Sequence, residues 1–376
     1  MSALKLRFTA AAAAVLFINA FSFTVSAEDT EGTFALAEAE TGTIILESGA
    51  DTVLSCGSLT KLMTALLAAE AVEDGKASLD GKMTASAHAN SLKGAEIWLV
   101  EGEKMSLYDL LKGAVPGNAN DAACTIAENL GGSEGKFTEI MNGRAAELGM
   151  KGTSFADSTG LGNSLSTAGD MALLSCELLR HETVKPVFSI YLDYVRNGET
   201  QIVNTNRLVR TYEGCTGLKY SFSEESGYCA AVSAERDGKA FVAALLGYPD
   251  KDTLFAKARE LLDHGFSAYS CVTPEAPEDF PDYIRVKGGV SEKVRAAYDK
   301  DIRIVVPNGK IRRIEGYAAY PEYVYAPVKA GDKLGELFYY LDGNLVYRGE
   351  IRAKSNVKAK SQGFLLSRLL KYLFEF

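Results

Sequence analysis

The chain has 376 residues, which is enough for one large domain and a smaller one. Hydrophobic residues make up 47% of it and charged residues 24%, a composition that excludes a wholly disordered chain. The formal net charge of −9 at pH 7 argues against nucleic acid as a partner, because nucleic-acid binding needs a basic surface.

The first 27 residues have the pattern of a secretory signal. Lys5 and Arg7 precede an apolar stretch at residues 8–23, and small residues at 25–27 suit a signal peptidase. We expect cleavage after Ala27, and the alternative is an uncleaved N-terminal anchor. Residues 1–27 hold two basic and no acidic residues, so residues 28–376 would carry a net charge of −11. The pattern predicts an exported protein at the outer face of the cytoplasmic membrane or in the cell wall.

Cysteine and histidine positions give no sign of a metal site. The chain has six cysteines and three histidines, without a C-x-x-C pair and without a histidine at metal-ligand spacing from another His or Cys. We therefore expect no metal and no cofactor. Export would permit disulfides. Cys215 and Cys229 flank a predicted hairpin, where they would either pair or fill the core as small residues.

The first half of the chain begins with strands and continues with helices. Short strands are predicted at 33–37 and 43–46, joined by a turn. A helix rich in Ala and Leu is predicted from 58 to about 72. Further helices are predicted within 107–149 and at 168–182.

After about residue 200 the hydrophobic period changes to that of strands. Three strands are predicted at 212–219, 228–235 and 240–247, followed by a helix at 252–264 with Gly265 as its C-terminal cap. Strands at both ends of this region, with helices between and after them, predict an α+β fold in which helices back one antiparallel sheet.

A proline-rich segment separates this region from a second one. Pro274, Pro277 and Pro281 lie among acidic residues, and we interpret residues 271–283 as a linker after a domain at 28–270. Residues 284–360 consist of short apolar runs between Gly, Asn and Asp turns, which predicts a small all-β domain.

The last segment, residues 361–376, has the pattern of an amphipathic helix. Nine apolar side chains between 364 and 376 form a broad face, and the polar ones cluster opposite them. At about 15 residues the segment is too short to span a bilayer, so we expect it to lie in the membrane interface as an anchor. The alternative is a helix docked on the protein's own β domain.

The most informative motif is Ser58-Leu59-Thr60-Lys61 at the start of the first long helix. Serine is a poor nucleophile until a base removes its proton, and residues i and i+3 share a helix face, so Lys61 can reach Ser58 Oγ. Burial would lower the pKa of the lysine toward that of a base, and the helix N-terminus favours a developing oxyanion. By position alone, an ordinary N-cap serine with a solvated lysine explains the spacing equally well.

The surrounding sequence closely resembles the low-molecular-weight penicillin-binding proteins, the D-alanyl-D-alanine carboxypeptidases. The run from Gly57 to Leu67 resembles their active-site helix, and the resemblance extends from about residue 32 to the end of the chain. It includes Asn120-Asp121-Ala122-Ala123, Thr216-Gly217-Leu218-Lys219 and residues 324–331. The resemblance implies a β-lactamase/transpeptidase-like domain followed by a small β domain.

The family's motifs S-x-x-K, S-x-N and K-T-G imply roles for five residues. Ser58 would be the nucleophile that forms an acyl ester, and Lys61 its base. Asn120 would orient the substrate amide, and Lys219 would bind the substrate carboxylate. The backbone N–H groups of Ser58 and Phe222 would form the oxyanion hole.

Two of these motifs are altered here. Asn118 stands at the serine position of S-x-N, and an amide cannot relay a proton as a hydroxyl does. Tyr220 and Ser221 stand where the family has Thr and Gly. Because side chains alternate along a strand, Ser221 points the same way as Lys219 and places a hydroxyl in a space that glycine leaves empty. The bulky Tyr220 ring is expected to narrow the cleft or to alter how the site binds the substrate carboxylate. We expect slower catalysis than in an enzyme with complete motifs.

Two functions follow from these residues. The first is a serine-type carboxypeptidase that removes the terminal D-alanine of peptidoglycan stem peptides, with β-lactam antibiotics as covalent inhibitors. The second is a catalytically impaired homologue that acts as a peptidoglycan- or penicillin-binding protein. A class A β-lactamase is disfavoured, because residues 153–165 hold no loop for a glutamate-activated water and because of the extra β domain. A Ser-His-Asp hydrolase is disfavoured because no G-x-S-x-G elbow is present.

Overall fold

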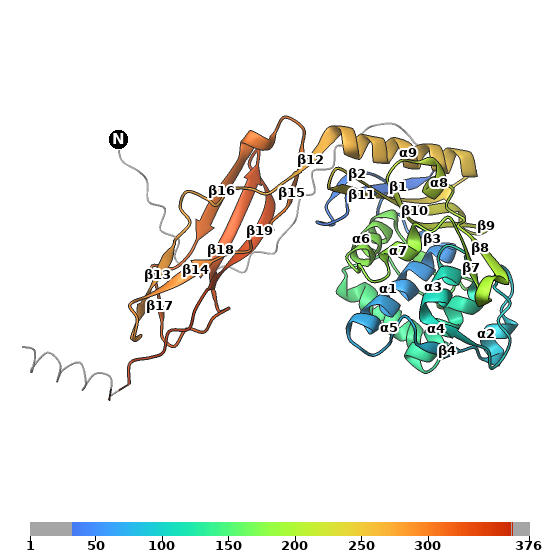
Figure 1. Cartoon of the computed structure of the whole chain (residues 1–376). Coiled ribbons are helices and arrows are strands. Elements are labelled where there is room, and N and C mark those ends of the chain that lie inside the picture. The colour runs from blue at the N-terminus through green and yellow to red at the C-terminus, as the bar shows by residue number, and fades with distance from the viewer. Residues whose placement is uncertain (1–31, 362, 364–376) are drawn as a thin grey trace, which may run out of the picture.

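The computed structural model describes residues 32–361 and 363, which form two bodies joined end to end (Figure 1). A larger body of helices and strands comes first, and an elongated β body follows it. The predicted signal at 1–27 and nearly all of the predicted helix at 361–376 lie outside the described residues. Within the part of the chain that is described, no helix combines the length and the apolar character needed to cross a bilayer.

The first body is built on one antiparallel sheet of five strands. Its order is β2-β1-β11-β10-β9, so the two N-terminal strands pair with the last of three consecutive strands from later in the chain. The central residues of β10 and β11 are almost wholly buried and, apart from Ser233, apolar, because both faces of the sheet are covered. All five predicted strands are confirmed: β1 (Thr33–Glu38), β2 (Ile44–Ser48), β9 (Cys215–Ser223), β10 (Gly227–Arg236) and β11 (Lys239–Tyr248).

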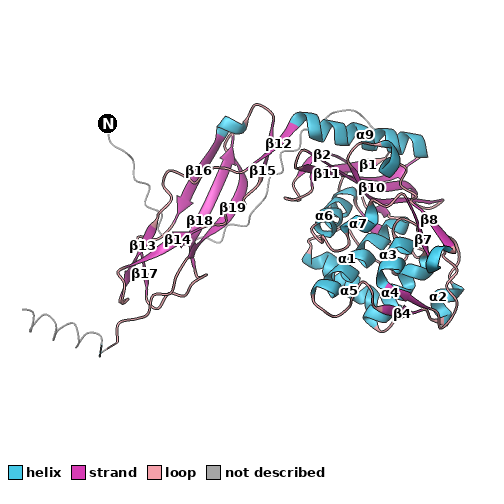
Figure 2. Cartoon of the chain, in the orientation of Figure 1, coloured by secondary structure: helices cyan, strands magenta, loops and turns pink. Residues whose placement is uncertain are grey.

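Most helices pack on one face of this sheet (Figure 2). In α1 every residue from Lys61 to Ala69 is buried, as expected of a helix that passes through the centre of a domain. Its small alanine side chains let neighbouring helices approach it from several sides. The helices of this layer are α1 (Lys61–Glu73), α3 (Leu107–Ala114), α4 (Asn120–Gly131), α5 (Glu134–Glu147) and α6 (Ala168–Leu179).

Short elements complete the first body. The chain enters α1 through a 3₁₀ turn, so the predicted helix at 58–72 begins as a 3₁₀ helix and becomes α-helical only at Lys61. These elements are β3 (Leu54–Ser55), η1 (Gly57–Thr60), β4 (Lys82–Thr84), α2 (Ala87–Ser91), β5 (Lys104–Ser106), β6 (Leu165–Ser166), α7 (Lys185–Phe188), β7 (Leu192–Val195), η2 (Arg196–Gly198), β8 (Thr200–Val203) and α8 (Leu208–Thr211).

The opposite face of the sheet is covered by α9 (Lys251–Ala268). Asp250 caps its N-terminus by accepting the N–H groups of Asp252 and Thr253. The prediction that Gly265 ends this helix is wrong, because the helix continues to Ala268. A Cβ atom at Gly265 would lie 2.9 Å from Cγ of Phe241 in β11, so the glycine lets the helix approach the sheet closely.

The second body is an all-β domain, as predicted for 284–360. Its main sheet has the order β16-β18-β19-β14-β13-β17, and only the β13–β17 pair is parallel. A core of Ile, Val, Leu and Tyr side chains lies beneath it. Its strands are β13 (Tyr283–Lys287), β14 (Lys293–Ala297), β16 (Ile314–Ala319), β17 (Tyr323–Tyr325), β18 (Lys333–Leu341) and β19 (Asn344–Ala353), with a 3₁₀ turn η3 (Ile311–Arg313).

A two-stranded ladder joins the two bodies. β12 (Tyr269–Val272) continues directly from α9 and pairs with β15 (Ile304–Pro307). The interpreted linker at 271–283 therefore begins inside a strand, and its residues 273–282 contain neither helix nor strand. All six cysteines lie within the described residues as free thiols, and Cys215 and Cys229 do not pair.

Gly265→Ala is expected to lower the free energy of unfolding by about 1 kcal/mol, even though alanine favours a helix by about 1 kcal/mol. The reason is that the new methyl group would overlap the buried Phe241 ring. Gly143→Ala in α5 is the matched control, since nothing lies within 4 Å of that position. It should raise the free energy of unfolding. Urea denaturation of both variants checks the pair, and a gain of stability in Gly265→Ala would contradict the packing argument.

Candidate active site

Ser58 lies in the 3₁₀ turn that leads into α1. Gly57 precedes it with φ +48°, and Thr60 Oγ1 donates to the Gly57 carbonyl at 2.8 Å, which fixes the turn. A side chain at Gly57 would also lie 2.8 Å from Ser221 Oγ, so only glycine fits there. Ser58 Oγ is a buried atom, and the described residues offer it no hydrogen-bond partner. The backbone turn thus positions the Ser58 hydroxyl, which itself forms no hydrogen bond with the described residues.

Lys61 is completely buried one turn further on. Its Nζ donates to Asn120 Oδ1 and to the Thr159 carbonyl, both at 2.7 Å. Burial lowers the pKa of this amine to about 7, although the negative charges of Asp157 and Asp121 act in the opposite direction. Among the described contacts no hydrogen bond joins Lys61 Nζ to Ser58 Oγ. Catalytic hydrogen bonds often tighten only when substrate is bound.

Asn120, at the first position of α4, fixes the lysine from one side. Its Oδ1 accepts from Lys61 Nζ, and its Nδ2 donates to the Lys93 carbonyl at 2.7 Å. These two contacts settle which end of the amide faces the lysine. Asn118 lies two residues earlier with φ +65°, a left-handed conformation that asparagine tolerates. Its Oδ1 is buried and finds no hydrogen-bond partner among the described residues.

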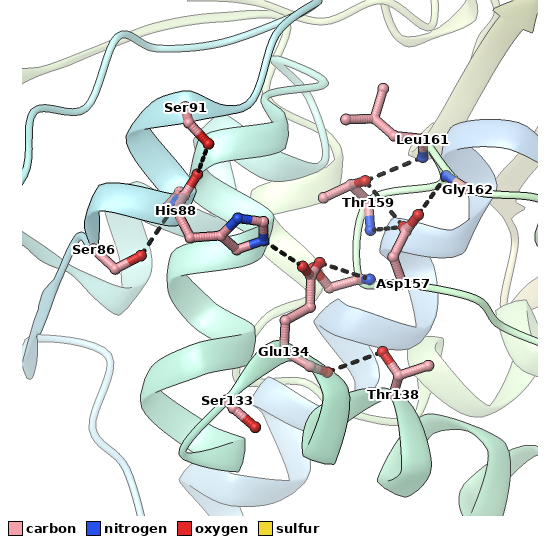
Figure 3. A network of polar contacts seen from close by, with 12 residues as sticks. Ser86, His88, Ser91, Ser133, Glu134, Thr138, Asp157, Thr159, Leu161 and Gly162 are labelled. Carbon is pink, nitrogen blue, oxygen red and sulfur yellow. Dashed lines mark hydrogen bonds and ion pairs between the residues drawn. The ribbon is translucent and has the colours of Figure 1, made fainter.

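The loop at 157–162 holds Lys61 from the other side. The Asp157 carboxylate accepts the backbone N–H groups of Thr159, Gly160 and Gly162, part of which Figure 3 shows. A Cβ atom at Gly160 would lie 2.0 Å from the Gly57 carbonyl oxygen, so the loop passes directly over the turn that carries Ser58. The contact to Lys61 comes from a backbone carbonyl, so no side-chain motif in the sequence could have revealed it.

Lys219 lies on β9, on the same side as Ser58, and is also completely buried. Its Nζ donates to the Val115 carbonyl at 3.0 Å. Burial lowers the pKa of Lys219 well below its usual range, and the nearby charge of Lys61 lowers it further. Two amines in one desolvated site favour binding of an anion.

Ser221 contacts the predicted oxyanion hole. Its side chain is buried, and its Oγ accepts the backbone N–H of Ser58 at 2.9 Å. That N–H is one of the two donors expected to stabilise the oxyanion. The Ser221 hydroxyl, which stands where the family has glycine, therefore fills space in the site and also accepts the hydrogen bond of the Ser58 N–H.

The expectation that Tyr220 narrows the cleft is wrong. Its ring stacks on Phe255 of α9 with a centroid distance of 5.4 Å, on the opposite face of the sheet from Lys219 and Ser221. The strand's alternation of side chains is the reason. Phe222 places its ring 4.3 Å from that of Tyr228, so only its backbone remains a candidate for the site.

Comparison with known proteins gives a consistent result. Residues 22–250 match the family model "D-alanyl-D-alanine carboxypeptidase", and residues 275–359 match "Penicillin-binding protein 5, C-terminal domain". The chain is 32% identical over 329 residues to the D-alanyl-D-alanine carboxypeptidase DacF of Bacillus subtilis, covering 86% of this chain and 85% of DacF. It is 28% identical to DacC of Escherichia coli, covering 94% and 92% of the two chains.

Solved structures show the same architecture. Penicillin-binding protein 5 of Haemophilus influenzae superposes with a TM-score of 0.77 at 24% identity, covering 88% of this chain and 98% of that one. The ampicillin-bound form of penicillin-binding protein D2 of Listeria monocytogenes is 31% identical, with a TM-score of 0.58 and coverage of 63% and 98%.

Proposed function

The chain belongs to the D-alanyl-D-alanine carboxypeptidase family of serine peptidases, and on this premise we propose that it removes the terminal D-alanine of peptidoglycan stem peptides through an acyl-enzyme on Ser58. The observation that carries this proposal is an unengaged Ser58 hydroxyl placed one helical turn before the buried amine of Lys61. A pKa of about 7 leaves roughly half of these amines neutral at pH 7, which suits a general base.

The first chemical step forms the acyl-enzyme. Neutral Lys61 accepts the proton of Ser58 Oγ as the oxygen attacks the carbonyl carbon of the penultimate D-alanine. The peptide C–N bond then breaks, and the proton held by Lys61 passes to the leaving amine of D-alanine. Water next attacks the ester carbonyl, its proton returns Ser58 to the hydroxyl form, and the shortened peptide leaves with a free carboxylate.

Asn120 and Lys219 position the substrate in this proposal. The Asn120 amide faces the reacting groups and is held by Lys61 and the Lys93 carbonyl, so it can orient the substrate amide. A substrate carboxylate near Lys219 would favour its charged form and offset the burial that lowers its pKa. Asn118, without a hydroxyl, cannot relay the proton to the leaving group, so Lys61 must deliver it.

The alternative interpretation, a binding protein without turnover, has one observation in its favour. The Ser58 N–H already donates to Ser221 Oγ and is not free for an oxyanion. It is the weaker interpretation, because the nucleophile, its base and the asparagine are all present in one site. The Ser221 contact predicts slow acylation rather than none.

Incubation of the protein with benzylpenicillin should give a covalent adduct of one penicillin on Ser58, detected by mass spectrometry. The Ser58→Ala variant should give none, because the adduct is an ester of this hydroxyl. A folded protein that forms no adduct would favour the binding-protein interpretation.

The rate of penicillin acylation should rise about tenfold per pH unit below pH 7 and level off above it, because Lys61 must be neutral to act as the base. A rate independent of pH between 5 and 9 would exclude Lys61 as the base.

Ser221→Gly should accelerate penicillin acylation by at least about tenfold, because it frees the Ser58 N–H, and one oxyanion donor is worth about 100-fold or more. Stopped-flow acylation with a chromogenic β-lactam measures the effect. Tyr220→Thr is the matched control: it restores another family residue on the neighbouring position but faces α9. It should change the rate less than about twofold while lowering stability. An accelerating Tyr220→Thr or a neutral Ser221→Gly would contradict the geometry.

We also propose that the protein is exported and held at the outer face of the cytoplasmic membrane by residues 361–376. The support is the sequence pattern of the two termini. Deletion of residues 361–376 should move the protein from the membrane fraction to the soluble fraction without loss of penicillin labelling. Unchanged recovery with membranes would contradict the anchor and favour a helix docked on the β domain.

A further inference from the structure

Two groups of metal-ligating side chains occur among the described residues. One consists of His88, Cys124 and Glu134, and the other of Glu70, Glu177 and His181. Within each group the possible ligand atoms lie within 4.8 Å of one another. The first group lies beside the active-site loop and combines a thiol, an imidazole and a carboxylate.

We propose that His88, Cys124 and Glu134 bind one zinc ion. Cysteine sulfur and histidine nitrogen favour Zn²⁺ over Mg²⁺ or Ca²⁺, and a carboxylate is the usual third type of zinc ligand. Three protein ligands leave the fourth position of a tetrahedral zinc site to a water molecule. Separations of up to 4.8 Å require only small movements to converge on one ion, because His88 lies on the short helix α2 with a half-exposed side chain.

The carboxylate of Glu134 is already oriented for this role. Its Oε1 accepts from the backbone N–H and the Oγ of Ser158 at 3.2 and 2.5 Å. Its Oε2 faces His88 Nε2 at 2.9 Å, as Figure 3 shows. A metal ion would replace the hydrogen between these two atoms. The Ser158 contacts then act as the outer hydrogen bonds that commonly orient a metal-bound carboxylate.

Cys124 supplies the thiol of the site from inside the domain. Its side chain is completely buried in α4. Glu128 Oε2 is itself a buried oxygen with no hydrogen-bond partner among the described residues. Over the same part of the chain, neither Glu128 nor Glu134 forms a salt bridge with a lysine or arginine. A divalent cation would compensate this excess of negative charge and stabilise the thiolate.

In the second group, the negative charge of the carboxylates is already neutralised by an arginine. Arg144 Nε lies 2.7 Å from Glu70 and its Nη2 lies 2.9 Å from Glu177, so a guanidinium already occupies the space between the carboxylates. We therefore expect no zinc there. Sequence spacing predicts no metal site because it cannot reveal the first group, whose three ligands come from three separate helices.

The site has a structural consequence for the active site. Ser158, which Glu134 holds, adjoins Thr159, whose carbonyl accepts from Lys61 Nζ. The Ser158 carbonyl also accepts from Thr64 Oγ1 of α1 at 2.8 Å. Bound zinc would therefore fix the loop that positions the catalytic lysine.

Titration of the chelator-treated whole protein with Co²⁺, a spectroscopic substitute for Zn²⁺, tests the proposal. We expect one ion per chain, a thiolate-to-cobalt charge-transfer band, and loss of the band on addition of Zn²⁺. Cys124→Ser should abolish the band, and both Cys124→Ser and His88→Asn should weaken Zn²⁺ binding by about 100-fold or more. His88 is half exposed, so its substitution does not threaten the fold.

His181→Asn, in the arginine-compensated group, is the matched control and should bind metal as the unmodified protein does. Absence of the charge-transfer band in the unmodified protein would overturn the proposal. So would a band that persists in Cys124→Ser, or Zn²⁺ binding that depends on His181 rather than on His88. Circular dichroism confirms that each variant is folded, and penicillin labelling of Ser58 in each keeps this test separate from that of the proposed function.

Discussion

The burial of the Lys61 amine is the constraint on which the rest of the active site depends. A lysine removed from water loses several kcal/mol of solvation unless acceptors surround it or its proton leaves. Here two acceptors come from parts of the chain far apart in sequence, the Asn120 side chain and the Thr159 carbonyl. The start of α4 and the loop at 157–162 must therefore both pack against α1 before the site exists.

The same burial explains why the central helix has its composition. Every residue from Lys61 to Ala69 is enclosed, so small side chains are needed for other helices to approach closely. A second buried amine, Lys219, faces the same region from β9 and makes the environment less favourable for positive charge. The depressed pKa of Lys61 lets this amine act as a base at neutral pH, at a cost in stability that the large surrounding core offsets.

How much the sequence reveals depends on the range of the interaction. Alternating and helical patterns predict the five strands and the main helices, because these signals are local. The Ser58–Lys61 spacing alone does not decide between a nucleophile with its base and an ordinary helix cap, and the family resemblance of the surrounding sequence is what favours the first. The sequence does not decide the role of Gly265, because a helical glycine can serve close packing as well as capping, and only the position of Phe241 distinguishes the two. The motif position of Tyr220 suggests the cleft, but the alternation of side chains along β9 directs its ring to α9. The Thr159 carbonyl and the Glu134–Ser158 contact carry no side-chain signature, so only the fold reveals them.

Ser221 shows how one hydroxyl can tune a site without removing any of its machinery. Its oxygen accepts the Ser58 N–H much as a substrate oxyanion would, so the ground state already satisfies a donor that catalysis needs. A neutral hydrogen bond is worth about 1 kcal/mol, whereas one to an ionised oxygen is roughly twice as strong. An oxyanion can therefore displace the hydroxyl, but part of its stabilisation is lost in doing so. We expect the chemistry of Ser58 and Lys61 to be preserved and its rate to be lower than in an enzyme with glycine at the position of Ser221.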